Sequence, residues 1–251
     1  MIPLRDDNPV ERFPIITYTL VFLNLLAFAW QVGLPGVLSE PDLFAAMSES
    51  LAESVLRGGV IPFEIFTFTD EAPRNVVPPP FTIFTSMFLH GSAGHIAFNL
   101  LFLCIFGNNV EDALGRVRYV VFYLLSGVAA ALVQMISSAA SGDGELAIQM
   151  LHVPMVGASG AIAGVLAAYM VLFPRARVLT LVIIIILIRI FPLPAGWFIG
   201  LWFAGQLLSV FLGGNTGVAF FAHIGGFAAG FLLVRLVGRR HGWRARPRAY
   251  W

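Results

Sequence analysis

The chain has 251 residues, of which 58% are hydrophobic and only 12% are charged. Soluble domains carry about 25% charged residues, so this composition excludes an ordinary water-soluble fold. The net charge of +1 and the apolar character give no indication of nucleic-acid binding, and the single cysteine, Cys104, excludes an internal disulfide. We expect an all-α polytopic membrane protein with the lipid bilayer as its surroundings.

Six apolar runs approach or exceed the roughly 20 residues that a helix needs to cross a bilayer. The predicted spans are residues 15–32, 94–108, 119–138, 156–173, 196–212 and 218–237. We therefore expect one six-span domain over residues 15–238. A short polar tail, 1–14, precedes this domain, and a basic tail, 239–251, follows it.

Two segments outside these spans are also apolar in part. Residues 33–83 form a long first loop, and within it 37–56 mix apolar and acidic residues in a pattern typical of a helix in the membrane interface. The run 179–190 is strongly apolar but only about a dozen residues long, which favours an interfacial or re-entrant segment over a seventh span.

Arginine distribution predicts the orientation. With six spans, Arg57 and Arg74 are the only arginines on one side, and all the others fall on the side of the two termini. Positively charged loops stay in the cytoplasm, so both termini are expected there. We expect an inner (plasma) membrane protein of a bacterial cell.

Small residues surround a serine at the start of the fourth span, in Gly157-Ala158-Ser159-Gly160. One interpretation is packing, because Gly160 and Gly164 form a G-x-x-x-G pair that admits a neighbouring helix. The other is a nucleophile, which also needs small neighbours so that a base and a substrate can approach it.

His223 in the sixth span is the candidate base. It lies at the same expected depth as Ser159, and polar groups inside a span mark function by default. Gly226 and Gly230 share its helix face. Contact between this face and the Gly160/Gly164 face would bring His223 within hydrogen-bond reach of Ser159.

His95 and Asn99 in the second span lie four residues apart, on one helix face and at the same outer level. Their side chains and the backbone N–H of Ser159 could donate to an oxyanion formed during attack on an amide. No carboxylate lies at this level, so the pattern predicts a Ser–His dyad.

The segments 157–160, 90–99 and 222–226 together resemble the rhomboid family of intramembrane serine proteases. The resemblance covers nearly the whole chain and implies a six-span rhomboid-like bundle with an interfacial helical first outer loop. It implies Ser159 as nucleophile, His223 as general base, and His95 and Asn99 at the oxyanion. The implied substrates are other transmembrane proteins, with no cofactor.

The sequence departs from the family pattern at two places. Ala163 stands where some bacterial members have an aromatic residue that stacks on the histidine, and Phe81-Thr82 where some have a Trp-Arg pair. For substrate entry we expect the face of the fifth span that carries Trp197, Phe198, Trp202 and Phe203, with the turn 213–217 as a lid.

Two alternatives stay open. A catalytically inactive membrane chaperone could share the fold. A metal-dependent membrane protein could use His90, His95, His152 and His223, although no H-E-x-x-H motif occurs. The oligomeric state is open.

Overall fold

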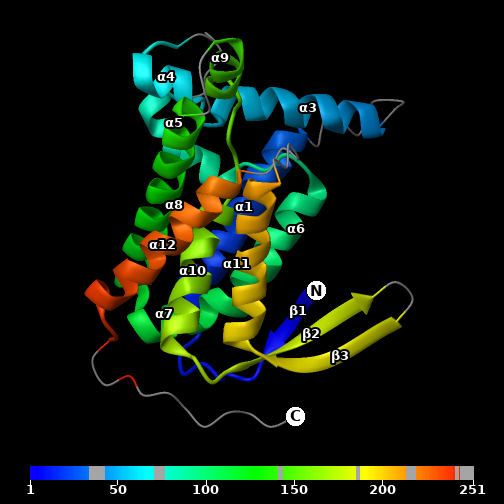
Figure 1. Ribbon diagram of the computed structural model, residues 1–251, viewed down its shortest axis with the longest axis vertical. Helices are drawn as coiled ribbons and strands as arrows, with labels where there is room; N and C mark the ends of the chain where they lie inside the picture. The colour runs from blue at the N-terminus through cyan, green and yellow to red at the C-terminus, as the bar shows by residue number, and fades with distance from the viewer. Residues whose placement is uncertain are drawn as a thin grey trace.

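The computed structural model describes residues 1–33, 43–70, 77–140, 144–184, 187–212, 219–240 and 243. The molecule is a bundle of helices with a small sheet at one end (Figure 1). The long helices are α1 (Ile15–Val32), α3 (Leu43–Gly58), α8 (Arg116–Ala139), α10 (Ser159–Leu172), α11 (Ala195–Phe211) and α12 (Phe220–Val237). The shorter helices are α4 (Pro62–Thr67), α5 (Pro79–Thr85), the 3₁₀ turn η1 (Ser86–Phe88), α6 (Ala93–Phe102), the π-helical η2 (Leu103–Gly107), α7 (Asn108–Leu114) and α9 (Glu145–Leu151).

Four helical stretches among the described residues are long and apolar enough to cross a membrane. They are α1, the continuous run α6–η2–α7 (Ala93–Leu114), α8 and α12. The other two predicted spans are apolar helices of 14 residues (α10) and 17 residues (α11). The mostly helical membrane bundle is therefore confirmed, whereas only four of the six spans reach full spanning length.

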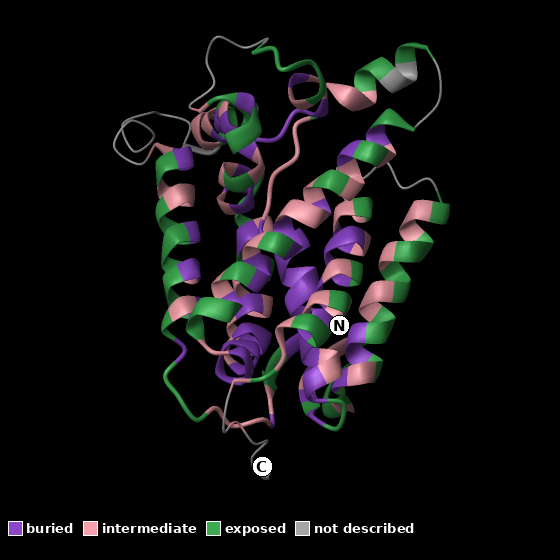
Figure 2. Ribbon diagram, turned by 90° about the vertical axis from the view of Figure 1, so that its left-hand side faces the viewer, coloured by how far each residue is buried: buried purple, intermediate pink, exposed green. Residues whose placement is uncertain are grey.

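Helix α10 lies in the middle of the bundle, between α8, α12 and the α6–η2–α7 run (Figures 1 and 2). Its sequence is apolar on every side, and its residues from Gly160 to Tyr169 are all buried. A helix that is hydrophobic all round is stable when protein surrounds it. The outer helices instead keep exposed apolar side chains such as Phe22, Ile136 and Leu232, which suit contact with lipid.

The start of α1 is fixed by an acid from another helix. The carboxylate of Glu111 in α7 accepts hydrogen bonds from the backbone N–H groups of Ile16 (3.0 Å) and Thr17 (2.7 Å) and from Thr17 Oγ1 (2.8 Å). The first N–H groups of a helix have no partner within it, so this carboxylate satisfies donors that would otherwise be orphaned. The second span continues past the predicted end at residue 108, because Glu111 and Asp112 lie in α7.

The sheet is an addition to the expected all-α architecture. Strands β1 (Ile2–Asp6), β2 (Arg177–Ile184) and β3 (Leu187–Pro194) form an antiparallel sheet in the order β1-β2-β3. The apolar run 179–190 is thus a β-hairpin, and the expected polar tail 1–14 contains a strand. Isoleucine dominates the run and favours extended backbone. Pro192 and Pro194 fit an edge strand, where no partner needs their missing N–H.

The first loop contains α3, as the amphipathic pattern over 37–56 predicted for most of its length. Residues 37–42 of that pattern and the proposed lid 213–217 lie outside the described residues.

Candidate active site

Ser159 and His223 come together at one end of the bundle. Ser159 is the first residue of α10, and His223 lies in the first turn of α12. The Ser159 Oγ atom lies 2.8 Å from His223 Nε2, within hydrogen-bonding distance. His223 is buried, and Ser159 is half-buried.

Contact between glycine faces brings these two side chains together. A Cβ atom placed on Gly226 would lie 1.9 Å from the carbonyl oxygen of Gly160, and one on Gly230 would lie 2.4 Å from the Cα of Gly164. No side chain fits at either position, so the backbones of α10 and α12 touch directly. Because Gly160 follows Ser159 and Gly226 lies three residues after His223, this contact sets the distance between hydroxyl and imidazole.

Gln206 of α11 holds the other side of the imidazole. Its Oε1 atom lies 2.6 Å from His223 Nδ1. An amide oxygen only accepts hydrogen bonds, so Nδ1 carries the ring proton and the lone pair of Nε2 faces the Ser159 hydroxyl. This is the tautomer in which a histidine can accept a proton from serine.

Trp202 lies one helical turn before Gln206 and packs beside the same ring. Its ring centroid is 5.7 Å from that of His223, at an interplanar angle of 41°. An aromatic ring thus lies beside His223 even though Ala163 supplies none. The sequence pattern alone did not indicate that Trp202 and Gln206 contact His223. The available signal was an aromatic and an amide four residues apart in an apolar span.

The ring of His95 stands beside the chain that leads into Ser159. A Cβ atom on Gly157 would lie 2.8 Å from His95 Nε2 and 3.6 Å from Ser159 Oγ. Gly157 also has φ +124°, a backbone conformation that side chains rarely adopt. Glycine is required here on both grounds, and its lack of a side chain leaves His95 next to the serine.

Asn99 is buried one turn farther along α6. Its Nδ2 atom donates to the backbone carbonyl of His95 at 3.0 Å, so one of its two N–H bonds is used within the helix. The N–H group of Ser159 begins α10 and has no acceptor within that helix. Ser159 N–H and the His95 ring thus lie near the serine hydroxyl, and Asn99 is bonded to the His95 carbonyl.

His90 supports this region from the loop before α6. Its backbone N–H donates to Gln31 Oε1 (2.8 Å), and its ring meets the His95 ring edge-on, with the centroids 5.0 Å apart. Burial, assisted by the positive charge of His95, lowers the pKa of His90 to about 3. His90 is therefore neutral at physiological pH.

The four histidines considered as alternative metal ligands are not arranged as a metal site in the described residues, although the rings of His90 and His95 are in contact. His152 stacks on Phe63 with a centroid separation of 4.5 Å. Over the described ranges of the chain, no group of three or more His, Cys, Asp or Glu side chains is arranged to hold a metal ion.

A cavity of about 40 Å³ adjoins Ser159 between α10, α8 and the chain after α9, with Gly157 and Ser86 in its lining. A buried water needs at least about 10–15 Å³, so this space beside the serine is large enough to hold one.

The aromatic residues of α11 do not share one face. Trp197 is 68% exposed, whereas Phe198 is only 1% exposed and belongs to the core. Phe203 stacks on Phe227 of α12 with ring centroids 4.2 Å apart. The prediction that these four residues form one face of the fifth span is therefore wrong. Trp202 is the one of the four whose ring lies beside His223.

Comparison with known proteins adds independent findings. Residues 79–240 match the family model described as the Rhomboid domain. The chain is 29% identical over 160 residues to the Rhomboid protease AarA of Providencia stuartii, covering 61% of this chain and 49% of that protein. It is 32% identical over 129 residues to the mitochondrial Presenilin-associated rhomboid-like protein of Mus musculus. That match covers 51% of this chain and 30% of the mouse protein. It is 31% identical over 123 residues to the mitochondrial Rhomboid protein 1 of Saccharomyces cerevisiae. That match covers 49% of this chain and 32% of the yeast protein. The matches thus span about a third to a half of the length of these relatives.

Proposed function

Because this chain belongs to the rhomboid family, we propose that it is an intramembrane serine endopeptidase. Its substrates are other membrane proteins, cut within or near their membrane-spanning segments. The observation that carries this proposal is the 2.8 Å contact between Ser159 Oγ and His223 Nε2, with Gln206 fixing the tautomer of the ring.

The proposed reaction begins with attack by the Ser159 oxygen on the carbonyl carbon of a peptide bond. His223 Nε2 takes the hydroxyl proton, and the charged ring keeps its Nδ1–H bond to Gln206. The tetrahedral oxyanion faces the Ser159 N–H and the His95 ring, with Asn99 bonded to the His95 carbonyl. His223 then returns the proton to the leaving amine, which leaves an acyl group on Ser159.

Water completes the cycle. His223 accepts a proton from a water molecule, the resulting hydroxide adds to the acyl carbon, and the proton returns to Ser159 as the acid product leaves. The cavity beside Ser159 and Gly157 supports this step because it gives water a place next to the acyl group.

We further propose that both termini lie in the cytoplasm of a bacterial cell and that the site opens toward the outer side of its inner membrane. Arginine distribution supports this orientation. Arg12, Arg116, Arg118 and Arg240 line one pocket at the start of α8 and after α12. These segments lie at the end of the bundle remote from the start of α10 (Figure 1).

The test is a serine-directed fluorophosphonate probe combined with cleavage of a panel of single-span membrane proteins. We expect Ser159→Ala to abolish labelling and to lower cleavage about a thousandfold or more, because the nucleophile is lost and only a small residue is needed at this position. Ser209→Ala is the matched control, since its hydroxyl donates to the Gly205 carbonyl of its own helix, away from the candidate site.

Unchanged cleavage by Ser159→Ala would end the proposal. A non-catalytic chaperone of the same fold would show neither labelling nor cleavage in the wild-type chain.

A further inference from the structure

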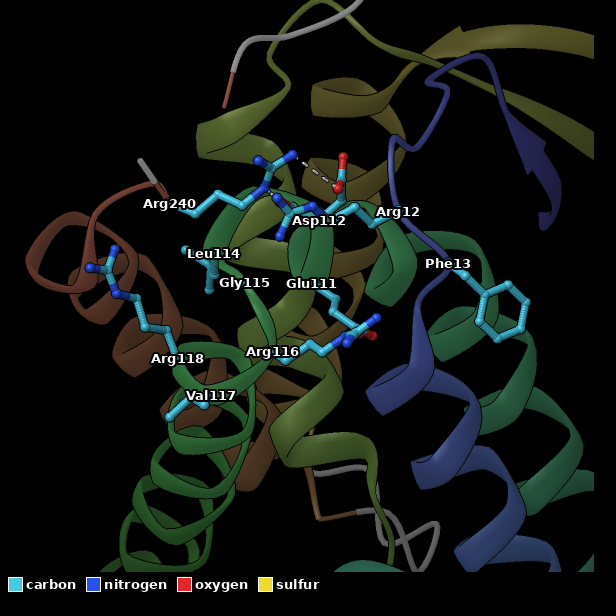
Figure 3. Close-up of a pocket in the computed structure, with 10 residues that line it drawn as sticks. All are labelled: Arg12, Phe13, Glu111, Asp112, Leu114, Gly115, Arg116, Val117, Arg118 and Arg240. Atoms are coloured by element: carbon cyan, nitrogen blue, oxygen red, sulfur yellow. Dashed lines mark hydrogen bonds and ion pairs between the residues drawn. The ribbon is translucent and has the colours of Figure 1, made fainter. Parts of the chain in front are cut away.

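A second hollow lies at the end of the bundle remote from Ser159. Figure 3 shows this pocket, of about 590 Å³, between the chain before α1, the end of α7, the start of α8 and the chain after α12. The lining residues are Arg12, Phe13, Glu111, Asp112, Leu114, Gly115, Arg116, Val117, Arg118 and Arg240. Four arginines and two carboxylates leave the lining with a net positive charge, and nothing in the proposed protease mechanism uses it.

The two carboxylates of the pocket are already engaged. Glu111 is held by the N–H groups at the start of α1. Asp112 accepts from the backbone N–H of Glu11 at 3.0 Å and pairs with Arg240 at 3.4 Å. Arg240 also pairs with the carboxylate of Glu11. Of the four arginines, Arg240 is thus the one whose charge is compensated from within the protein.

Arg12 and Arg116 differ from Arg240 in this respect. Within the described part of the chain, neither forms a hydrogen bond or ion pair, and both are exposed. Figure 3 shows them reaching toward the pocket from the chain before α1 and from the first residue of α8, whereas Arg118 extends away and donates to the Arg239 carbonyl at 3.1 Å. Two guanidinium groups that face one pocket and form no ion pair with the described residues match a phosphate, which accepts paired N–H donors from each.

Exposed apolar side chains also line the pocket. Phe13 is 69% exposed and stacks on Tyr18 of α1, with ring centroids 5.2 Å apart. Val117, on the other wall, is 79% exposed. Farther along α1, Phe22 is also exposed. A free phosphate ion would leave these apolar groups in water, whereas an acyl chain would cover them.

The depth of the pocket also fits a lipid. Arg12 precedes the first residue of α1 by three positions, and Arg116 is the first residue of α8. Both helices are long enough to cross the membrane, so their ends lie at the level of the phospholipid headgroups.

We propose that this pocket binds an anionic phospholipid, with its phosphate between Arg12 and Arg116 and an acyl chain along Phe13 and the exposed face of α1. The site is independent of the proposed protease activity.

The test is native mass spectrometry of the purified full chain with phosphatidylglycerol or phosphatidylcholine added to the detergent. We expect the wild-type chain to retain phosphatidylglycerol in preference to phosphatidylcholine. The double variant Arg12→Gln/Arg116→Gln should retain it about tenfold more weakly or worse, because two charged contacts are lost.

Arg175→Gln/Arg189→Gln is the matched control. It removes the same charge from two exposed arginines at the same end of the protein, outside the pocket, and should change retention less than about twofold. Arg12 lies outside the described helices, so the single variant Arg12→Gln leaves those helices unaltered. We expect it to weaken lipid retention less than the double variant does.

Three results would overturn the proposal. One is equal loss in the two double variants, which would mean general surface attraction. Another is equal retention of the two lipids. The third is displacement of the lipid by millimolar inorganic phosphate or glycerol phosphate, which would identify a site for a soluble anion.

Discussion

At the scale of single residues, His223 has two hydrogen-bonding neighbours that act on opposite ring nitrogens. Ser159 faces Nε2, and Gln206 faces Nδ1. In serine hydrolases with three-membered sites, the third group holds the imidazole in the productive tautomer and orientation. Gln206 does this here with a neutral amide, so it orients the ring without adding a negative charge inside the bundle.

We predict that Gln206→Ala lowers kcat about tenfold and leaves KM nearly unchanged. The hydrogen bond it removes contributes on the order of 1 kcal/mol and acts on the ring rather than on the substrate. Steady-state cleavage of one membrane substrate by the purified protein measures both constants.

Gln134→Ala is the matched control for this prediction. Gln134 is also a half-buried amide that contacts α12, but its Oε1 accepts from the backbone N–H of Ala222 at 3.1 Å. Its loss should lower thermal stability and leave kcat within about twofold. Equal kcat losses in the two variants would assign Gln206 a structural role only.

The sequence predicted much of the site but not all of it. Glycine spacing in two spans predicted the approach of Ser159 and His223, and helical periodicity placed His95 and Asn99 on one face. Gln206 could not be assigned, because α11 is apolar on all sides and its sequence does not show which face meets α12.

At the scale of helices and strands, the contact between α10 and α12 admits no added atom. We predict that Gly226→Ala destabilises the protein by about 2 kcal/mol or more, because its Cβ would strike the Gly160 carbonyl and force the helices apart. Proteolytic activity should fall with it, since the same contact sets the distance between Ser159 and His223. Thermal unfolding in detergent measures the stability.

Gly200→Ala separates this steric effect from the general effect of adding a methyl group. A Cβ on Gly200 of α11 meets no atom within 4 Å. Alanine is favoured over glycine in a helix by about 0.5–1 kcal/mol, so this variant should be as stable as the wild type or more so. Equal destabilisation by the two substitutions would contradict the packing argument.

The strand β1 carries a carboxyl group with an unusual titration. Burial raises the pKa of Asp6 to about 7, although the Tyr169 hydroxyl donates to it at 2.5 Å and favours the charged form. In the unfolded chain this carboxyl ionises near its ordinary pKa of 3.8. Between these values the folded state binds a proton that the unfolded state has lost, so stability decreases as the pH rises from about 4 to about 7.

We therefore predict that the unfolding temperature falls over this pH range in the wild-type chain and that Asp6→Asn makes the fall smaller. The amide keeps an oxygen for Tyr169 and carries no charge at any pH. Thermal unfolding scans at a series of pH values measure the slope. Asp70→Asn, an exposed aspartate at the opposite end of the bundle, should keep the wild-type slope, and an identical slope in Asp6→Asn would refute the prediction.

Prediction from sequence worked better for the helices than for the sheet. The bounds of α1 coincide with the predicted first span, because Pro14 and Gly33 flank an uninterrupted apolar run. The hairpin was missed because periodicity cannot distinguish a continuous apolar run in a strand from one in a helix. Strand β1 was missed because its partner, β2, lies some 170 residues away in sequence, and nothing local in residues 1–14 indicates that pairing.

At the scale of the whole molecule, the two ends of the bundle carry different chemistry. Ser159 lies at one end, and the arginine-lined pocket and the sheet lie at the other (Figure 1). The positive-inside rule then predicts which end faces the cytoplasm. Single cysteines introduced into a Cys104→Ser background test this prediction.

We expect Phe68→Cys, an exposed position at the Ser159 end, to react with a membrane-impermeant maleimide in spheroplasts, which lack an outer membrane. Arg175→Cys, at the sheet end, should react only after the membrane is opened. The reverse labelling pattern would invert the proposed topology.

The burial of α10 has a consequence for how the protein responds to its lipid surroundings. Bilayers differ in hydrocarbon thickness, and a helix in contact with lipid accommodates a mismatch by tilting or by thinning the bilayer around it. Here the lipid-facing helices α1, α8 and α12 receive that adjustment, while α10 is enclosed by protein along nearly its whole length. Ser159 is therefore carried by a helix shielded from lipid, whereas His223 is carried by the lipid-facing α12. The direct backbone contact between α10 and α12 is what keeps the two side chains together when α12 adjusts to the bilayer.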